Sequence, residues 1–225
     1  MKKILSLSFV ALLGLIPSTA FAGVIFATGN PGNQGTDNVV FTPCSGNITG
    51  PAALVSGCLN TDHSLFVDFW DGGVNLVVNG GQARIEGDNS AAFSQLSFGF
   101  ESATLGFTKA IFNLNTTSQD VGTITITAHL FGGSTLTSQI FNVANGQNFF
   151  NVVADGTDLI DFVSFVSSVG VDSVSFQDAR QFRLGGNTCD PSSTACGGGG
   201  GGGGDNPVPE PASLALLGAG LAGVA

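Results

Sequence analysis

Polar and apolar residues alternate with a period of two along most of this chain, and this pattern constrains the fold more than any other feature. The segment 123–130 shows it most clearly: its polar members are Thr123, Thr125, Thr127 and His129, with apolar residues between them. Successive side chains of a strand point to opposite faces, so this segment is expected to be a half-buried β-strand with His129 on its polar face.

The same alternation predicts about a dozen short strands and no convincing helix. Besides 123–130, the expected strands are 24–26, 65–70, 74–78, 83–86, 96–100, 107–114, 135–143, 149–153, 159–166, 173–176 and 181–184. Gly132-Gly133, Asn145-Gly146 and Asp71-Gly72-Gly73 separate such runs and are typical of tight turns. The pattern therefore predicts an all-β fold: one domain over residues 23–188, an antiparallel β-sandwich of jelly-roll type.

The charge of the chain argues against two classes of partner. Sixteen acidic residues stand against six basic ones, which gives a net charge of −10. Two of the basic residues, Lys2 and Lys3, lie in the segment that we expect to be removed, so the mature chain is more acidic still. Such a charge argues against nucleic acid or an anionic lipid surface as a partner.

The first 22 residues have the three parts of a secretory signal peptide. Lys2 and Lys3 provide the positive start, Ile4 to Ile16 the apolar core, and Ala20-Phe21-Ala22 an A-x-A cleavage site. As a helix, the apolar core would span about 20 Å, short of the roughly 30 Å of a bilayer's hydrocarbon core. We expect export, with signal peptidase cutting between Ala22 and Gly23.

The C-terminal end is modular as well. Eight consecutive glycines occupy positions 197–204, and poly-Gly has no side chains to bury, so residues 189–207 are expected to form a Cys-bounded loop and a flexible tether. Val208-Pro209-Glu210-Pro211 then precedes an apolar run from Leu214 to Ala225. Two prolines keep the backbone extended and accessible just before the apolar segment, which is the order of a sorting tag.

The segment from Val208 to Gly218 resembles the C-terminal signal of PEP-CTERM proteins. The resemblance implies processing by an exosortase, a membrane protease-transpeptidase of Gram-negative bacteria, at Val208, Pro209, Glu210 and Pro211. It also implies an envelope, outer-surface or exopolysaccharide-matrix location, with only transient membrane contact through the tail. The family's tail is longer and ends in several Arg residues, so segment 208–225 is expected to be a truncated signal. Segment 142–186 resembles the closing strands of sandwich domains in these proteins.

Four cysteines in an exported chain predict two disulfides, for which three pairings exist. Proximity along the chain favours Cys44 with Cys58 and Cys189 with Cys196. Since no C-x-x-C motif occurs, thiol redox catalysis is not expected.

No catalytic motif stands out. The chain lacks G-x-S-x-G, and its two histidines, His63 and His129, are best interpreted as a turn residue and an inert strand residue. The G-x-G-x-x-G match at 218–223 has no room for a following helix. We expect a non-enzymatic envelope or matrix protein without a cofactor; a carbohydrate-binding module of that matrix is the alternative, and a secreted hydrolase a remote one.

Two acidic groups are candidate binding sites. Asp155, Asp158 and Asp161 flank a turn and offer carboxylate oxygens suited to Ca²⁺, although Asp also favours turns without a metal. Asp68 and Asp71 surround Trp70, the one tryptophan of the chain. An exposed indole can stack on a sugar ring, such as that of an exopolysaccharide, while the carboxylates bind its hydroxyls. The alternation leaves open whether Trp70 belongs to the core.

Overall fold

The computed structural model describes residues 23–32, 35–79, 84–117, 121–155 and 158–189. Its strands are β1 (Val24–Thr28), β2 (Asp37–Val40), β3 (Leu54–Leu59), β4 (Phe66–Trp70), β5 (Leu76–Asn79), β6 (Arg84–Gly87), β7 (Gln95–Phe100), β8 (Leu105–Gly106), β9 (Lys109–Thr116), β10 (Gly122–Leu130), β11 (Thr135–Thr137), β12 (Phe141–Val143), β13 (Gln147–Ala154), β14 (Ile160–Ser167), β15 (Phe176–Gly185) and β16 (Thr188–Cys189). Two 3₁₀ turns, η1 (Asp88–Ser90) and η2 (Gly170–Asp172), complete the described elements. Within these ranges no helix is long and apolar enough to cross a membrane. The expected signal peptide and the tether and tag after Cys189 lie outside the described residues.

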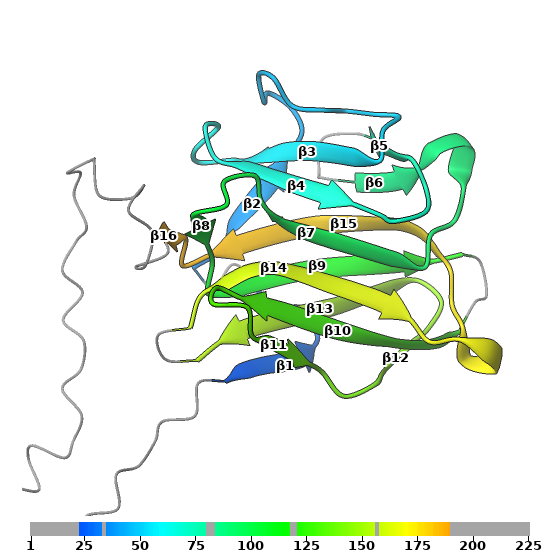
Figure 1. The fold of residues 1–225 in the computed structure, drawn as a ribbon. Coiled ribbons are helices and arrows are strands. Elements are labelled where there is room, and N and C mark those ends of the chain that lie inside the picture. The colour runs from blue at the N-terminus through cyan, green and yellow to red at the C-terminus, as the bar shows by residue number, and fades with distance from the viewer. Residues whose placement is uncertain (1–22, 33–34, 80–83, 118–120, 156–157, 190–225) are drawn as a thin grey trace, which may run out of the picture.

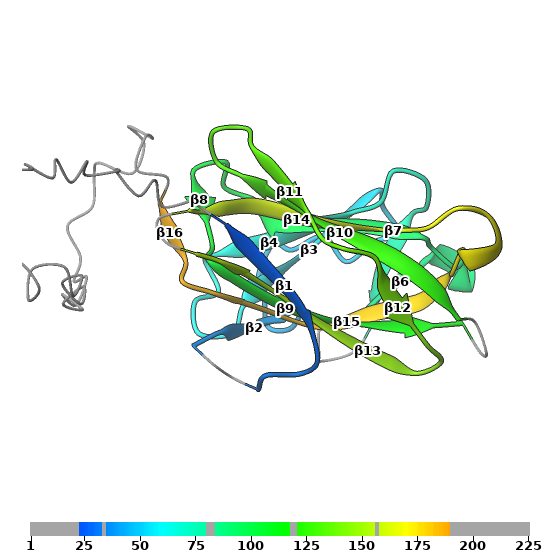
Figure 2. The same cartoon turned by 90° about the horizontal axis from the view of Figure 1, so that it is seen from below.

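The strands form two facing layers, a β-sandwich (Figures 1 and 2). Sheet A runs β1-β13-β9-β15, with β6 and β5 continuing beyond β15; sheet B runs β3-β4-β7-β14-β10, with β11 and β12 along its far edge. All of these described pairs are antiparallel. From β9 to β15 the long strands alternate between the sheets, as in a jelly roll, so the predicted fold class is confirmed.

Strand β2 joins the two sheets. Its first two residues, Asp37 and Asn38, pair with β15 of sheet A, and the next two, Val39 and Val40, pair with β3 of sheet B. The sandwich is therefore closed along this side over a short distance. Where β2 leaves β15, the two strands separate.

Phenylalanine rings fill the space between the sheets. Phe182 of sheet A lies with its ring centroid 4.7 Å from that of Phe69 and 5.0 Å from that of Phe98, both of sheet B. Phe98 in turn meets Phe112 of sheet A at 5.3 Å, and all three contacts are edge-to-face. Such pairs stabilise a core by about 0.5–1.5 kcal/mol beyond the burial of their area. Alternating inward residues of both sheets thus build one core.

The predicted strands are present with shifted ends, and two of them differ locally; β2, β3, β8 and β16 were not predicted. β10 buries Ile124, Ile126, Ala128 and Leu130 and leaves the Thr and His face half-buried, as predicted. The expected strand 135–143 is split into β11 and β12, because the Ser138 hydroxyl accepts the Ile126 N–H at 2.9 Å. The expected strand 173–176 begins only at Phe176, because the Val174 N–H donates to the Ser167 hydroxyl at 2.7 Å.

The disulfide expected between Cys44 and Cys58 is present and ties the loop after β2 to β3. Cys189 is also disulfide-bonded and lies in β16, which pairs with β8. Its expected partner Cys196 lies outside the described residues.

Candidate functional site

The outer surface of sheet B carries aromatic side chains in cross-strand register. Asp68 of β4, Gly99 of β7, Phe162 of β14 and His129 of β10 form one row across the sheet. Trp70, Ser97, Ser164 and Thr127 form the next row. Their neighbours along the strands, including Phe69 and Phe98, are buried between the sheets, so both rows face outward. We call the following set the aromatic face: Asp68, Trp70, Gln95, Ser97, His129, Asp161, Phe162 and Ser164.

Phe162 is at the centre of this face. Its ring centroid lies 5.5 Å from that of Trp70 and stacks on the His129 ring at 3.8 Å with an interplanar angle of 12°. His129 Nε2 is within hydrogen-bond distance, 3.3 Å, of the Ser164 hydroxyl. Gly99 makes this packing possible, since a Cβ there would lie 2.8 Å from the Cβ of Phe162. The three rings therefore hold one another in place on half-buried positions.

Two depressions lie on the aromatic face. One, of ≈ 320 Å³, is lined by Trp70 together with the polar side chains of Gln95, Ser97 and Ser164. The other, of ≈ 250 Å³, lies against the β10–β11 turn and is lined by His129, Asp161 and Phe162 among others. Each depression thus combines an aromatic wall with groups that donate or accept hydrogen bonds.

Burial shifts the pKa values of the acids and the histidine on this face. It raises the pKa of Asp68 to about 6, and the nearby charge of Glu101 acts in the same direction. Burial also raises the pKa of Asp161, against the opposing influence of His129, and lowers the pKa of His129, against that of Asp161. At neutral pH the face therefore offers the Asp68 carboxylate, mostly ionised, and a neutral His129 imidazole.

Asp71 is placed below this surface. It is buried, and its Oδ1 accepts the Gly73 N–H at 3.0 Å and the Gln95 Nε2–H at 3.2 Å. It closes the β4–β5 turn and orients the Gln95 side chain. Of the three candidate glycan residues, the structure places Trp70 and Asp68 on the aromatic face and Asp71 in a supporting position.

The three aspartates proposed as a calcium site are not gathered by the structure. Asp155 is exposed after β13, whereas Asp161 is the extra residue at a register shift between β10 and β14 and lies beside His129. In the described ranges, no group of three or more His, Cys, Asp or Glu side chains is arranged to hold a metal ion.

Several residues of the aromatic face were not among the predicted site residues. Alternation along 159–166 indicates that Phe162 and Ser164 lie on the same face of their strand. Alternation along 123–130 also predicts that His129 lies on the polar face of its own strand. What the sequence does not show is the register that brings β14 between β7 and β10 and so places Phe162 beside Trp70.

Residues 207–225 match the PEP-CTERM protein-sorting motif. No curated protein matches the sequence. Solved structures that are similar include a variant of CBM29-2, a family 29 carbohydrate-binding module, with 14% identity and a TM-score of 0.38 over 61% of this chain and 89% of that one. CBM29_1, a family 29 module from Piromyces equi, has 12% identity and a TM-score of 0.38 over 73% and 91%. Similarity at this level carries no argument about what this chain binds.

The sorting motif at 207–225 is that of exosortase substrates. The chain is accordingly an exported β-sandwich protein of the cell envelope or the extracellular space.

Proposed function

We propose that the sandwich domain is a non-catalytic carbohydrate-binding module of the cell envelope or its exopolysaccharide matrix. The aromatic face is the binding surface, and Trp70 is its main contact. The observation that carries this proposal is the half-buried indole of Trp70 at the wall of a depression of ≈ 320 Å³ whose other lining includes Gln95, Ser97 and Ser164.

The chemistry of this depression suits a sugar. A pyranose ring has apolar C–H faces and a rim of hydroxyls, each of which donates and accepts hydrogen bonds. The indole of Trp70 offers a rigid apolar surface to the C–H face of the sugar. The amide of Gln95 and the hydroxyls of Ser97 and Ser164 offer hydrogen-bond partners to its hydroxyls. Because Asp71 fixes Gln95 and Phe162 packs against Trp70, little side-chain freedom remains to be lost on binding.

The placement of the acids supports binding over hydrolysis. A glycosidase needs two carboxyl groups that face one cleft from opposite sides of the scissile bond. Asp161 lines the depression near the β10–β11 turn, whereas Asp68 lines neither depression and belongs to β4, which is separated from β14 by β7. We therefore propose no enzymatic activity.

A glycan array of bacterial exopolysaccharide fragments, followed by calorimetry with the mature chain from Gly23, tests this proposal. We expect Trp70→Ala to weaken binding about tenfold or more, since aromatic anchors dominate such contacts. Phe149→Ala removes a half-buried aromatic side chain from sheet A and is expected to leave binding unchanged.

Equal glycan affinity of wild type and Trp70→Ala would contradict the binding surface, and release of new reducing ends would contradict the non-catalytic role. If no glycan is retained, the exported protein is better described as a structural component of the envelope or matrix.

A further inference from the structure

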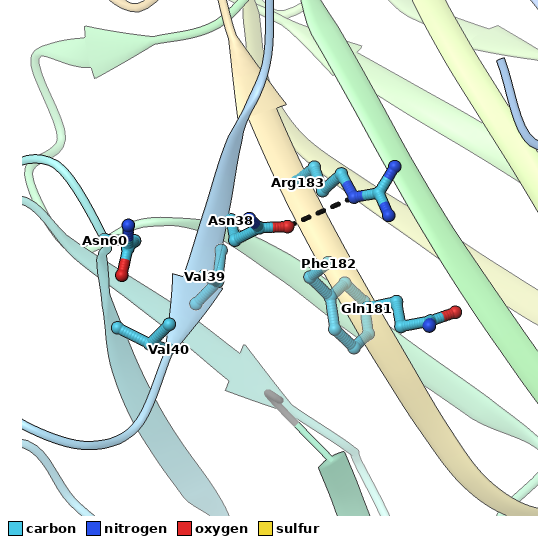
Figure 3. Close-up of a pocket in the computed structure, with 7 residues that line it drawn as sticks. All are labelled: Asn38, Val39, Val40, Asn60, Gln181, Phe182 and Arg183. Carbon is cyan, nitrogen blue, oxygen red and sulfur yellow. Dashed lines mark hydrogen bonds between the residues drawn. The ribbon is translucent and has the colours of Figure 1, made fainter. Parts of the chain in front are cut away.

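A further pocket, away from the aromatic face, opens where β2 leaves β15 to join sheet B (Figure 3). It has a volume of ≈ 230 Å³. The buried side chains of Val39 and Phe182 contribute its apolar lining, and its polar lining consists of Asn38, Asn60, Gln181 and Arg183. This volume is many times what one water molecule needs, so the pocket can admit a larger ligand.

The pocket exists because β15 is irregular at this point. The edge of β15 that faces away from β9 pairs with β6 as far as Ala179 and with β2 from Arg183 onward. Between them, in the described part of the chain, residues 180–182 have no strand partner on this edge. Gln181 has a left-handed backbone conformation, with φ of 57°, at the register shift between β15 and β9. Figure 3 shows Gln181 and Arg183 extending to the same side of β15.

Arg183 is held in an unusual way for so acidic a chain. Its Nε donates to Asn38 Oδ1 at 3.1 Å and its Nη1 to Asn30 Oδ1 at 3.4 Å, both neutral amide oxygens. Among the described residues it has no acidic partner. By contrast, Arg180 makes a two-point contact with Asp178, at 2.6 and 2.8 Å, and Arg84 lies 3.3 Å from the same carboxylate. The guanidinium of Arg183 is thus positioned and still able to bind an anion.

The distribution of charge favours this place for an anion. The basic residues after Gly23 are Arg84, Lys109, Arg180 and Arg183, and all four belong to β6, β9 or β15 of sheet A. The aromatic face of sheet B carries Asp68 and Asp161. The positive charges of the mature chain are thus concentrated on the sheet that forms this pocket, and they reduce the repulsion that an anionic ligand meets there.

We propose that this pocket binds one carboxylate-bearing sugar unit, a hexuronate within an acidic polysaccharide. Arginine binds a carboxylate through two parallel N–H···O bonds. The Gln181 Oε1 already accepts from Asn113 Nδ2 at 3.1 Å and the Asn38 Oδ1 from Arg183, so the N–H groups of these two amides and the whole amide of Asn60 suit the hydroxyls of the same unit. An acidic peptide would supply the carboxylate but not the adjoining hydroxyls. The inference concerns a second site and does not depend on the aromatic face.

Calorimetry at low salt with the mature chain, an oligogalacturonate and a neutral galacto-oligosaccharide of equal length tests the proposal. We expect saturable binding of the oligogalacturonate, weakened about tenfold or more by Arg183→Met. Arg183→Lys should bind with intermediate affinity, because an ammonium cannot form the two-point contact. Lys109→Met removes the same charge from the same sheet and is the control, with affinity expected within about twofold of wild type.

Asn60→Ala provides a second variant, because Asn60 lines the pocket without contacting Arg183; we expect a moderate loss of uronate affinity with unchanged thermal unfolding. Trp70→Ala should leave uronate binding unchanged, so failure of one site is distinguishable from failure of the other. Equal oligogalacturonate affinities of wild type and Arg183→Met would overturn the proposal. So would a neutral oligosaccharide that binds wild type as tightly as the oligogalacturonate does and loses affinity in Arg183→Met. Displacement of the uronate by an equally tight Glu-rich peptide would overturn it in favour of a protein partner.

Discussion

The packing of the aromatic face depends on the absence of a side chain at Gly99. In Gly99→Ala, the new Cβ would lie 2.7 Å from the carbonyl oxygen of Asp161 and 2.8 Å from the Cβ of Phe162. Both neighbours belong to β14, whose residue Phe162 is paired with Gly99 in the middle of sheet B, so neither can move without disturbing the sheet. Overpacking of this kind costs about 1–3 kcal/mol. We expect Gly99→Ala to lower the free energy of unfolding by about 2 kcal/mol.

Urea unfolding followed by circular dichroism measures this loss. Gly73→Ala is the matched control, because its Cβ would find its nearest neighbour, Asp71 Oδ1, at 3.9 Å; we expect a change within about 0.5 kcal/mol. Emission from Trp70 should change in Gly99→Ala, since Phe162 lies against the indole. A Gly99→Ala variant as stable as Gly73→Ala and with wild-type emission would refute this explanation of the face.

Three further predictions concern stability and sorting. Replacing Cys44 and Cys58 by Ser, which opens a loop with a sequence separation of 14, should lower the free energy of unfolding by about 3 kcal/mol in urea titrations. Folding raises the pKa of Asp68 to about 6, so the folded chain binds the proton of this carboxyl more tightly than the unfolded chain does. The free energy of unfolding therefore falls as the pH rises from about 4 to 6. Asp68→Asn should therefore be more stable than wild type above pH 6 and show no gain below pH 4; equal pH profiles would contradict this. Glu210→Ala should prevent processing, so mass spectrometry of protein from native envelope and medium should find the C-terminus near Pro209–Pro211 in wild type and the uncut tail in the variant.

Alternation in the sequence predicts most of the sandwich because each strand has one face in the core. It is least informative where both faces of a strand are apolar. In β4, Val67 and Phe69 point inward while Phe66 and Trp70 point outward, and hydrophobicity alone does not distinguish the two sets. β3 has no alternation at all, because five of its six residues are buried, including Gly57, where a Cβ would lie 2.7 Å from the Val40 carbonyl oxygen.

The two candidate sites depend on features that no local pattern encodes. Trp70 and Phe162 are far apart in sequence. Their rings come together because β4 and β14 pair with opposite edges of the same strand, β7. The pocket at Arg183 requires β2 to pass from one sheet to the other and a non-glycine residue, Gln181, with positive φ. The sorting tag, by contrast, is a linear motif that a partner enzyme reads from the chain, and the sequence is sufficient to identify it.

Binding of carbohydrate to the aromatic face can be observed directly, because Trp70 is the one tryptophan of the chain. The measurement is a titration of the mature protein with the neutral oligosaccharide that it retains most strongly, followed in parallel by tryptophan emission and calorimetry. If the sugar stacks on Trp70, the emission changes saturably with the same midpoint as the heat. A calorimetric isotherm that saturates while the emission stays constant would place the sugar elsewhere and contradict the proposed function.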